Sequence, residues 1–386
     1  MNEKFLPFAL PCIGEEEINE VVDTLRSGWL TSGPKTKYFE EEFAKFIGIP
    51  NALAVNSCTA GLHLALEAIG IQPGDKIITT PYTFTATAEV IRYLGAEPLF
   101  VDIDPNTFNI DVQQIAKALE TNDGIKAILP VHFAGQASDM DAILALAKQY
   151  SLKIVEDAAH ALPTYYKGRA VGTLGDITVY SFYVTKTLAT GEGGMIVTAN
   201  SDYAEHMQAL RLHGISKDIF NRSASNVPAW HYDIIAPGFK YNMNDIAAAL
   251  GIQQLRKINS FLQRRTEIAE QYNQAFADLP MHIPYQHPDS THAWHLYVIQ
   301  LKLEELLHID RNTFIEQMKE AGIGTSVHFI PLHLHTYWRE RYNFKPTDFP
   351  IALDAYQRAV SLPIYPSMTD VNVQRVITQV KSILLK

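Results

Sequence analysis

The chain has 386 residues, of which 47% are hydrophobic and 19% charged, so it can bury a large core and is not a disordered chain. Its 42 acidic and 32 basic side chains give a formal net charge of −10, which excludes a general basic surface for nucleic acid, and its two cysteines exclude a disulfide scaffold. No apolar run approaches the roughly 18 residues of a membrane span and the N-terminal residues do not form a signal peptide, so we expect a cytoplasmic protein that binds neither nucleic acid nor a membrane.

Two helices are predicted at the start of the chain, over 15–26 and from about 37 to 46. In the first, apolar residues follow the i, i+3, i+4, i+7 spacing of an amphipathic helix, and Gly28 ends it. Seven short apolar runs then alternate with helical stretches, at 52–55, 76–79, 98–102, 127–131, 153–155, 177–180 and 194–197. Short apolar runs between helices are typical of a mainly parallel sheet that is covered on both faces.

The pattern changes after a long predicted helix that ends near residue 255. A strand over 294–301, a helix over 312–321 and a closing helix over 370–385 follow. We therefore predict a large α/β domain over 1–255 with a seven-stranded sheet, and a smaller α+β domain over 256–386. The N-terminal helices are expected to pack near the smaller domain.

Open parallel sheets bind ligands at the carboxyl ends of their strands, so the residues after each run are the candidate site residues. Ser57, Cys58 and Thr59 lie between a predicted strand and a helix. A helix N-terminus with small side chains can hold a phosphate, and ordinary helix capping explains the same residues. Neither G-x-G-x-x-G nor G-x-x-x-x-G-K-[ST] occurs in the chain, so no dinucleotide or P-loop motif supports another reading.

A carboxylate and a lysine follow two later runs. Asp157 comes just past a buried strand and needs a partner, which a charged pyridine nitrogen, an arginine or a helix N-terminus would supply. Lys186 lies between an aromatic-rich strand and a glycine-rich turn. Apolar surroundings disfavour the charged form of a lysine, which is one route to an amine that forms a Schiff base. The alternative interpretation is that Lys186 is a surface lysine in a loop.

Together these segments resemble the DegT/DnrJ/EryC1/StrS sugar aminotransferases, which belong to the fold-type I pyridoxal-phosphate enzymes. The resemblance covers nearly the whole chain and is closest to members that form UDP-4-amino sugars. It rests on residues 29–34, 57–66, 81–87, 156–161, 180–198, 238–246, 328–331 and 361–363. It implies a PLP-dependent transferase fold, pyridoxal 5′-phosphate as cofactor, and a homodimer with shared active sites.

The resemblance also implies roles for individual residues. Lys186 would hold the cofactor covalently and then move the proton during transamination, and Asp157 would pair with the pyridinium nitrogen. His160 would lie near the phenolic oxygen of the ring, and Phe84 would stack on the ring face. The phosphate would be held by the cofactor-binding residues Ser57, Cys58, Thr59 and Ser181, with Lys240 or Asn242 reaching it across the dimer interface.

The chain departs from the family pattern at two places and has several histidines of the metal-ligand type. Many relatives have glycine where Cys58 stands, so this residue is either a small packed side chain or a reactive thiol. Many relatives also read G-x-N-x-R where this chain has Lys240 and Asn242. His328, His333 and His335 have the side-chain type of metal ligands, but no recognisable site pattern surrounds them, so we expect no metal.

The remaining site predictions concern the substrates. The resemblance places His328 near the sugar nucleotide or the donor carboxylate, while His295 has the pattern of a packed strand residue. Thr31 and Ser32 would contact substrate or only form a turn. Charge alone makes Arg211, Lys217, Arg222 and Lys240 candidates for binding a diphosphate, and the segment 213–235 could form a loop over the base or sugar.

The expected function is transfer of an amino group from L-glutamate to a nucleotide-linked keto-sugar, with a 4-keto-6-deoxy sugar favoured. The product would serve the biosynthesis of amino sugars and surface polysaccharide such as lipopolysaccharide. A 3-keto-sugar aminotransferase and a non-catalytic sensor with the same fold are the alternatives. The sensor predicts loss of the lysine or the carboxylate, and the chain has both Lys186 and Asp157.

Overall fold

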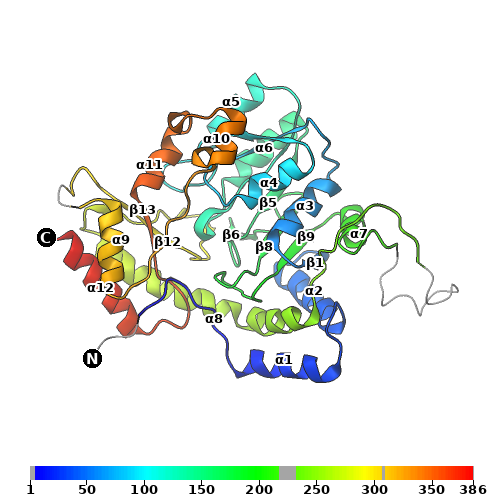
Figure 1. Cartoon of the computed structure of the whole chain (residues 1–386), viewed down its shortest axis with the longest axis horizontal. Coiled ribbons are helices and arrows are strands. Elements are labelled where there is room, and N and C mark those ends of the chain that lie inside the picture. The colour runs from blue at the N-terminus through cyan, green and yellow to red at the C-terminus, as the bar shows by residue number, and fades with distance from the viewer. Residues whose placement is uncertain (1–4, 217–231, 307–308, 386) are drawn as a thin grey trace.

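The structure is a computed structural model that describes residues 5–216, 232–306 and 309–385 (Figure 1). The helices are α1 Glu15–Ser27, α2 Pro34–Ile47, α3 Cys58–Ala68, α4 Ala86–Tyr93, α5 Val112–Thr121, α6 Met140–Tyr150, α7 Ser201–Leu210, α8 Asp245–Phe276, α9 Arg311–Glu320, α10 Thr336–Tyr342, α11 Pro350–Arg358 and α12 Asp370–Leu384. The strands are β1 Asn51–Val55, β2 Lys76–Thr79, β3 Glu97–Phe100, β4 Ile125–Ile128, β5 Lys153–Asp157, β6 Tyr165–Tyr166, β7 Arg169–Ala170, β8 Ile177–Ser181, β9 Gly194–Thr198, β10 Met281–His282, β11 Ser290–Thr291, β12 Tyr297–Leu301 and β13 Ala359–Leu362. No helix in these described ranges is both long and apolar enough to cross a bilayer.

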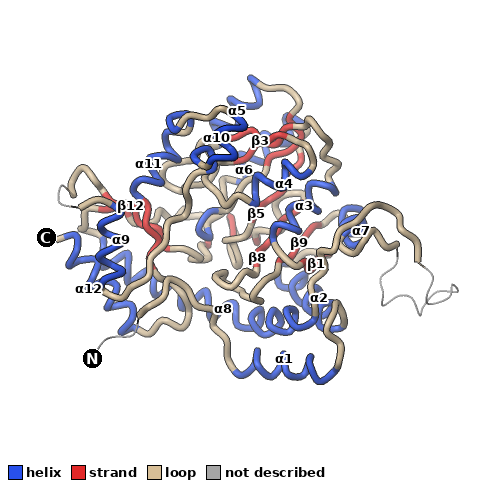
Figure 2. Tube along the Cα trace, in the orientation of Figure 1, coloured by secondary structure: helices blue, strands red, loops and turns tan. Residues whose placement is uncertain are grey.

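The large sheet has the strand order β1-β9-β8-β5-β4-β2-β3, which confirms the predicted mainly parallel, seven-stranded arrangement. Only β9 runs against its neighbours β1 and β8. Because residues 182–193 contain no helix to carry a crossover, β9 returns antiparallel to β8. The turn between them carries Lys186. Figure 2 shows the strands in two groups, the large sheet and a smaller one around β12.

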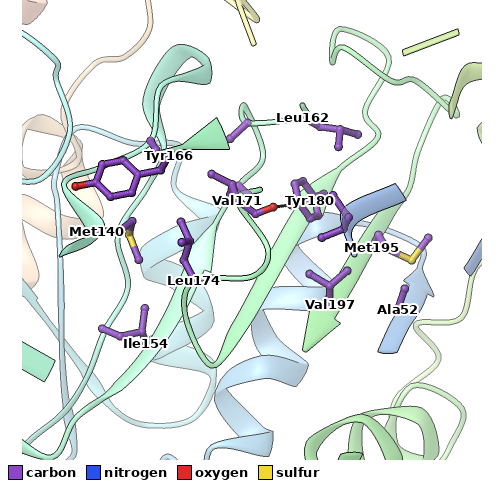
Figure 3. Packing of buried hydrophobic residues seen from close by; sticks show 14 of the residues in the cluster. Ala52, Met140, Ile154, Leu162, Tyr166, Val171, Leu174, Tyr180, Met195 and Val197 are labelled. Carbon is purple, nitrogen blue, oxygen red and sulfur yellow. Dashed lines mark hydrogen bonds between the residues drawn. The ribbon is translucent and has the colours of Figure 1, made fainter. Parts of the chain in front are cut away.

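Alternate residues of the strands of the large sheet pack into two cores, one on each face. Ala52 and Ala54 face the core under α2, α5, α6 and α8, while Leu53 and Val55 face the core under α3, α4 and α7. Figure 3 shows the first core, where the Tyr180 hydroxyl donates a hydrogen bond to the carbonyl of Val171. With both faces covered by helices, a ligand can reach the sheet only at the ends of its strands.

The 32-residue helix α8 takes part in both halves of the molecule (Figure 1). Leu255 and Phe261 belong to the core of the large sheet, whereas Ile268 and Phe276 belong to the core around α9, α12 and β12. The proposed division at residue 255 therefore falls inside α8. Helices α1 and α2 pack against α8, and Leu6, which precedes them, joins the small core.

The edge strand β1 is capped by side chains instead of by another strand. Glu40 accepts a hydrogen bond from the backbone N–H of Ala54 at 2.8 Å, and Arg211 donates to the Ala54 carbonyl at 2.8 Å. Glu40 and Arg211 also form an ion pair with each other. The pair occupies the N–H and the carbonyl of Ala54, which an added strand would otherwise bond, and so helps to protect this edge.

Candidate active site

Asp157 ends β5 and lies at the centre of the site. Its Oδ2 accepts a hydrogen bond from the Thr87 hydroxyl at 2.8 Å, and its Oδ1 accepts one from the Ala159 N–H at 3.0 Å. Thr87 has a single hydroxyl proton, so the Thr83 hydroxyl, 2.7 Å away, donates to Thr87. Burial raises the pKa of Asp157, while these two donors and the charge of Lys186 act to lower it. The carboxylate is thus fixed in orientation and ready for a cationic partner.

A second buried carboxylate, Glu156, stands beside Asp157 and faces the other way. It accepts hydrogen bonds from His132 Nε2 at 2.8 Å, from the Thr178 hydroxyl at 2.7 Å and from the Gly175 N–H at 2.8 Å. Because Nδ1 of His132 accepts the Ser138 N–H at 3.1 Å, the ring proton is on Nε2 and donates to Glu156. These donors hold the pKa of Glu156 below its usual value despite burial.

The contribution of Glu156 to stability should depend on pH. A carboxyl whose pKa is lowered by folding stabilises the protein above its unfolded value of 4.5, and the effect is lost as the pH falls through the folded pKa. We expect Glu156→Gln to be less stable by about 1–3 kcal/mol near pH 7, with the difference shrinking below pH 4.5. Urea unfolding of the wild type and of Glu156→Gln across this pH range measures the difference in their free energies of unfolding. Glu120→Gln at an exposed position is the control, and an equal pH dependence in both variants would contradict the prediction.

Lys186 lies in the turn between β8 and β9, where its backbone N–H bonds to the Tyr183 carbonyl at 2.8 Å. Burial lowers the pKa of Lys186 to about 8, with Cys58 and Asp157 acting in the opposite direction. A large fraction of the amine is therefore neutral, and so nucleophilic, at mildly alkaline pH. The structure brings the predicted lysine and the predicted carboxylate into one site.

His160 follows Asp157 after a short turn and is 6% exposed. Its Nδ1 accepts the Ala134 N–H at 3.2 Å, so the ring proton is on Nε2. Burial, with the charge of Lys186, holds the pKa of His160 well below its usual value, which keeps the ring neutral. Phe329 stacks on this ring, with 5.8 Å between the ring centroids. The ring centroid of Phe84 lies 6.4 Å from that of Phe329, and Phe84 is 62% exposed. Phe84 thus offers an open aromatic face.

The first turn of α3 forms a small cradle beside β9. Ser57 is the N-cap, and its hydroxyl accepts the Ala60 N–H at 3.1 Å. Cys58 and Thr59 supply the first backbone N–H groups of the helix, which are the groups that bind anions. The Cys58 thiol lies 3.9 Å from the Val179 carbonyl and burial raises its pKa well above the usual value, which favours a packed thiol over a reactive one.

The cradle depends on Gly194, the first residue of β9. A Cβ there would lie 2.9 Å from the backbone N of Cys58, 2.9 Å from the carbonyl carbon of Ser57 and 2.8 Å from the backbone carbonyl oxygen of Tyr180. These are backbone atoms on two sides, so the loop would have to move.

Ser181 ends β8 in the same region, and its hydroxyl accepts a hydrogen bond from the Tyr183 N–H at 3.3 Å.

Gly194→Ala is therefore expected to weaken cofactor binding. Overpacking of this kind costs about 1–3 kcal/mol, which corresponds to a loss of affinity of about 5- to 150-fold. The affinity is measured by titrating the apoprotein with pyridoxal 5′-phosphate and recording the absorbance. Gly193→Ala is the matched control, because the nearest atoms to its Cβ would belong to side chains and not to the backbone: Thr190 Oγ1 at 2.5 Å, the Met243 methyl at 2.7 Å and Phe182 Cβ at 3.5 Å. Equal affinities for both variants would contradict the expectation.

The segment with Lys240 and Asn242 runs beside the end of β1. The Asn242 side-chain amide donates to the Ser32 hydroxyl at 2.7 Å, and that hydroxyl donates to the Met243 carbonyl. The backbone N–H of Asp245 bonds to the Thr31 carbonyl at 3.1 Å. The Lys240 side chain is exposed, and its carbonyl accepts from Asn56 at 3.2 Å. The structure thus groups Thr31, Ser32 and Asn242 at one place.

The three histidines considered as metal ligands do not form a cluster, and two of them bond to other groups. His328 Nδ1 lies 2.8 Å from the Ser361 hydroxyl, and burial lowers the pKa of His328 to about 4. His333 Nε2 donates to the Pro346 carbonyl at 3.2 Å, and His335 precedes α10 as its N-cap. Across the described ranges, no group of three or more histidine, cysteine or acidic side chains could hold a metal ion.

Of the cations proposed for a diphosphate, Arg211 is already paired with Glu40 at the edge of β1. Lys217 and Arg222, with most of the segment 213–235, lie outside the described residues. The ladder that frames this segment is described: Ser216 N–H bonds to the Asp233 carbonyl at 2.9 Å and Ile235 N–H to the Gly214 carbonyl at 2.9 Å. It projects beside α7 (Figure 1).

Several residues of the site were not assigned a role from the sequence. Thr87, Glu156 and His132 lie around Asp157. Thr87 and Glu156 fall in the family-like segments 81–87 and 156–161, whereas His132 lies in none of the family-like segments. His295 is buried at 5% exposure before β12, not within the strand, and its ring centroid lies 4.5 Å from that of His160. No local pattern indicates this contact.

The groups around Asp157 suit pyridoxal 5′-phosphate. Backbone N–H groups of Cys58 and Thr59 match its phosphate, the fixed carboxylate of Asp157 matches its pyridinium nitrogen, and Nε2–H of His160 is a donor for its phenolic oxygen. Lys186 supplies an amine for its aldehyde. Each polar group of the cofactor therefore finds a side chain or amide of complementary chemistry.

Comparisons with known proteins identify the family of the chain. A profile of the DegT/DnrJ/EryC1/StrS aminotransferase family matches residues 11–381. The chain is 51% identical over 382 residues to the spore coat polysaccharide biosynthesis protein SpsC of Bacillus subtilis, with 98% of this chain and 97% of SpsC covered.

Solved structures give the same result. Spr1654 of Streptococcus pneumoniae, assigned as a sugar aminotransferase, is 34% identical in its PMP form with a TM-score of 0.91, covering 98% of this chain and 99% of that one. A PLP form of Spr1654 also matches, with a TM-score of 0.90. Helicobacter pylori PseC, an aminotransferase involved in pseudoaminic acid biosynthesis, is 30% identical with a TM-score of 0.91, covering 99% of this chain and 100% of PseC. The chain therefore belongs to the DegT/DnrJ/EryC1/StrS aminotransferase family, and pyridoxal 5′-phosphate is its cofactor.

Proposed function

We propose that the enzyme transfers an amino group from L-glutamate to the C4 keto group of a nucleotide-linked sugar, in the cytoplasm, for surface polysaccharide biosynthesis. The observation that carries the proposal is the pairing of Lys186, with its pKa of about 8, and the buried carboxylate of Asp157 in one site. The names of SpsC, Spr1654 and PseC support a sugar as the amino acceptor.

Lys186 is the group that moves protons in this proposal. When bound, the cofactor withdraws electrons from the carbon that carries the amine and so makes its proton acidic. The neutral ε-amine of Lys186 takes the proton from Cα of glutamate in the first half-reaction. In the second, Lys186 returns a proton to the sugar carbon that becomes the amine carbon.

The other residues of the site hold charge and orientation. Asp157 keeps a negative charge where a pyridinium needs a partner, and Thr87 with the Ala159 N–H fixes that carboxylate. His160 donates from Nε2 and, being neutral, does not repel the ammonium form of Lys186. The N–H groups of α3 hold the phosphate without adding a side-chain charge.

A homodimer with shared sites is part of the proposal. Large apolar side chains are exposed next to the Ser32–Asn242 pair, namely Trp29 at 42% and Leu30 at 46%. Ile234 and Ile235, in the ladder beside α7, are 52% and 59% exposed. Exposed apolar residues that gather around a polar cluster are typical of a protein interface. In the dimer, Asn242 or Lys240 would reach the phosphate bound by the partner.

The test is a product assay with a panel of substrates. The purified enzyme is incubated with pyridoxal 5′-phosphate, glutamate and UDP-, dTDP- or GDP-linked 4-keto and 3-keto sugars, and 2-oxoglutarate is measured for each. Turnover with a 4-keto sugar is the expected result. Turnover with 3-keto sugars alone would replace the proposed keto position, and no turnover with any member of the panel would contradict a nucleotide-sugar acceptor.

A further inference from the structure

The loop that follows β4 sets a backbone N–H against the ring of His160. The Ala134 N–H donates a hydrogen bond to Nδ1 of His160 at 3.2 Å. A backbone N–H can donate but cannot accept, so Nδ1 carries a lone pair and the single proton of the neutral ring is on Nε2. No residue in the described ranges accepts that Nε2 proton, which leaves it for a ligand. The direction of this N–H therefore decides what the ring offers to the site.

Ala134 has a backbone conformation that its neighbours must hold in place. Its φ is 57°, in the left-handed region, and a residue with a Cβ keeps such a conformation only where the surrounding structure fixes it. The Ala134 carbonyl accepts a hydrogen bond from the Leu296 N–H at 3.1 Å. The carbonyl of Gly135 accepts one from the Thr164 hydroxyl at 2.8 Å and one from the Ala293 N–H at 2.8 Å. These bonds hold the loop from one side.

Asn109, from the connection between β3 and α5, holds both ends of the same loop. The residue is buried, and its Oδ1 accepts a hydrogen bond from the Phe133 N–H at 2.8 Å. Its Nδ2 donates to the carbonyl of Gln136 at 3.2 Å and to that of Ala137 at 3.1 Å. A carboxamide has one acceptor oxygen and two N–H donors, so Asn109 can serve all of these backbone groups at once. A single side chain thus closes the loop around Ala134.

Phe133 connects Asn109 to His160 by a second route. The Phe133 ring meets the His160 ring edge-on, with 6.0 Å between the ring centroids. On its other sides it packs against Phe108 at 5.5 Å and Tyr82 at 5.5 Å between ring centroids. Phe108 directly precedes Asn109 in the chain. A change at Asn109 would therefore reach His160 both through the Ala134 N–H and through the Phe133 ring.

We propose that Asn109 is a positioning residue for the cofactor. By closing the loop 133–137 it keeps the Ala134 N–H on Nδ1 of His160, and so keeps the ring proton on Nε2, where it is offered to the phenolic oxygen of pyridoxal 5′-phosphate. In a neutral imidazole without such a partner, either nitrogen can carry the proton. The His160 ring would then present a lone pair to that oxygen for part of the time. This inference rests on the proposed placement of His160 beside the phenolic oxygen.

The first measurement is nitrogen NMR of the apoprotein with isotope-labelled histidine, in which the signals of His160 are assigned by their loss in His160→Gln. The wild type should show a protonated Nε2 and an unprotonated Nδ1. Asn109→Leu keeps a branched side chain but removes all three hydrogen bonds to the loop, so the two nitrogen shifts should move toward each other as the proton exchanges. Thr164→Val removes one bond to the loop and should give a smaller change in the same direction. Asn106→Ala, at an exposed position in the same connection, is the matched control and should leave the shifts unchanged.

The second measurement uses the protein loaded with pyridoxal 5′-phosphate. A donor at the phenolic oxygen stabilises its ionised form, and so lowers the pH at which the absorbance of the lysine-linked cofactor changes. Asn109→Leu should raise that inflection by about half a pH unit or more, the usual size of the effect of one hydrogen bond. Asn106→Ala should keep the inflection of the wild type.

The outcomes separate the inference from the proposed function. A wild-type ring protonated on Nδ1, or unchanged nitrogen shifts in Asn109→Leu, would overturn the inference, and if that variant does not fold, unchanged shifts in Thr164→Val would do the same. Altered shifts without a change in the absorbance inflection would overturn the link to the cofactor. A purely structural role of Asn109 predicts a lower melting temperature with both readouts unchanged. Absence of turnover with every keto-sugar would contradict the proposed acceptor, but it would leave the result on the apoprotein as it stands.

Discussion

Lys186→Ala is expected to lower kcat by about 10⁴-fold, because the variant lacks both the amine that captures the cofactor and the base that takes the Cα proton. The purified variant should also lose the absorbance of the lysine-linked cofactor. A single-turnover measurement with glutamate isolates the first half-reaction. In that measurement, added methylamine should restore part of the rate, since a small free amine can take the same proton.

Two controls belong with this variant. Thr185→Ala changes a neighbouring residue of the same turn and should retain most of the activity. Lys186→Arg keeps the positive charge but cannot act as a neutral base near pH 8, so it should be nearly as inactive as the alanine variant. Substantial turnover by Lys186→Arg would contradict the role assigned to the amine.

Asp157→Asn is expected to lower kcat by about 10²- to 10³-fold, the usual effect of removing one preorganised charge or donor from a reaction site. The amide keeps the size of the side chain but loses the negative charge that stabilises a protonated pyridine. Binding of the phosphate end should change little, because the α3 cradle is separate. Single-turnover rates and cofactor affinity, measured on the same sample, separate the two effects.

Thr87→Val provides a graded comparison for Asp157. Without the Thr87 hydroxyl, the carboxylate keeps only the Ala159 N–H as a donor among the described contacts. Its pKa, already raised by burial, should rise further, so activity should fall first on the acid side of the pH profile. A uniform loss at all pH values would indicate a structural defect instead of a change in ionisation.

The positions of Asp157 and Lys186 were predictable because each follows an apolar run, at the end of β5 and just after β8. These strands are parallel neighbours, so the residues that follow them meet at one edge of the sheet. The sheet itself followed from the same alternation of runs and helices. Local patterns of this kind are the part of a fold that a sequence expresses directly.

Contacts between distant segments could not be predicted in this way. Thr87 reaches Asp157 from α4, and Glu40 pairs with Arg211 from 171 positions away. The antiparallel direction of β9 depends on the lack of a helix between 182 and 193, which apolar runs alone do not reveal. His295 was interpreted as a packed strand residue, since burial in a core and burial in an active site leave the same pattern in sequence.

The length of α8 limits how this fold can be recombined. At 32 residues the helix is about 48 Å long, and it packs with Leu255 in one core and Phe276 in the other. A chimaera joined at residue 255 would build α8 from parts of two parent helices. The apolar face of each part would then meet core residues of the other parent. A crossover placed just before Asn244, which caps the helix, would transfer α8 whole. Exchange of acceptor specificity between relatives should therefore move this helix together with the C-terminal segment.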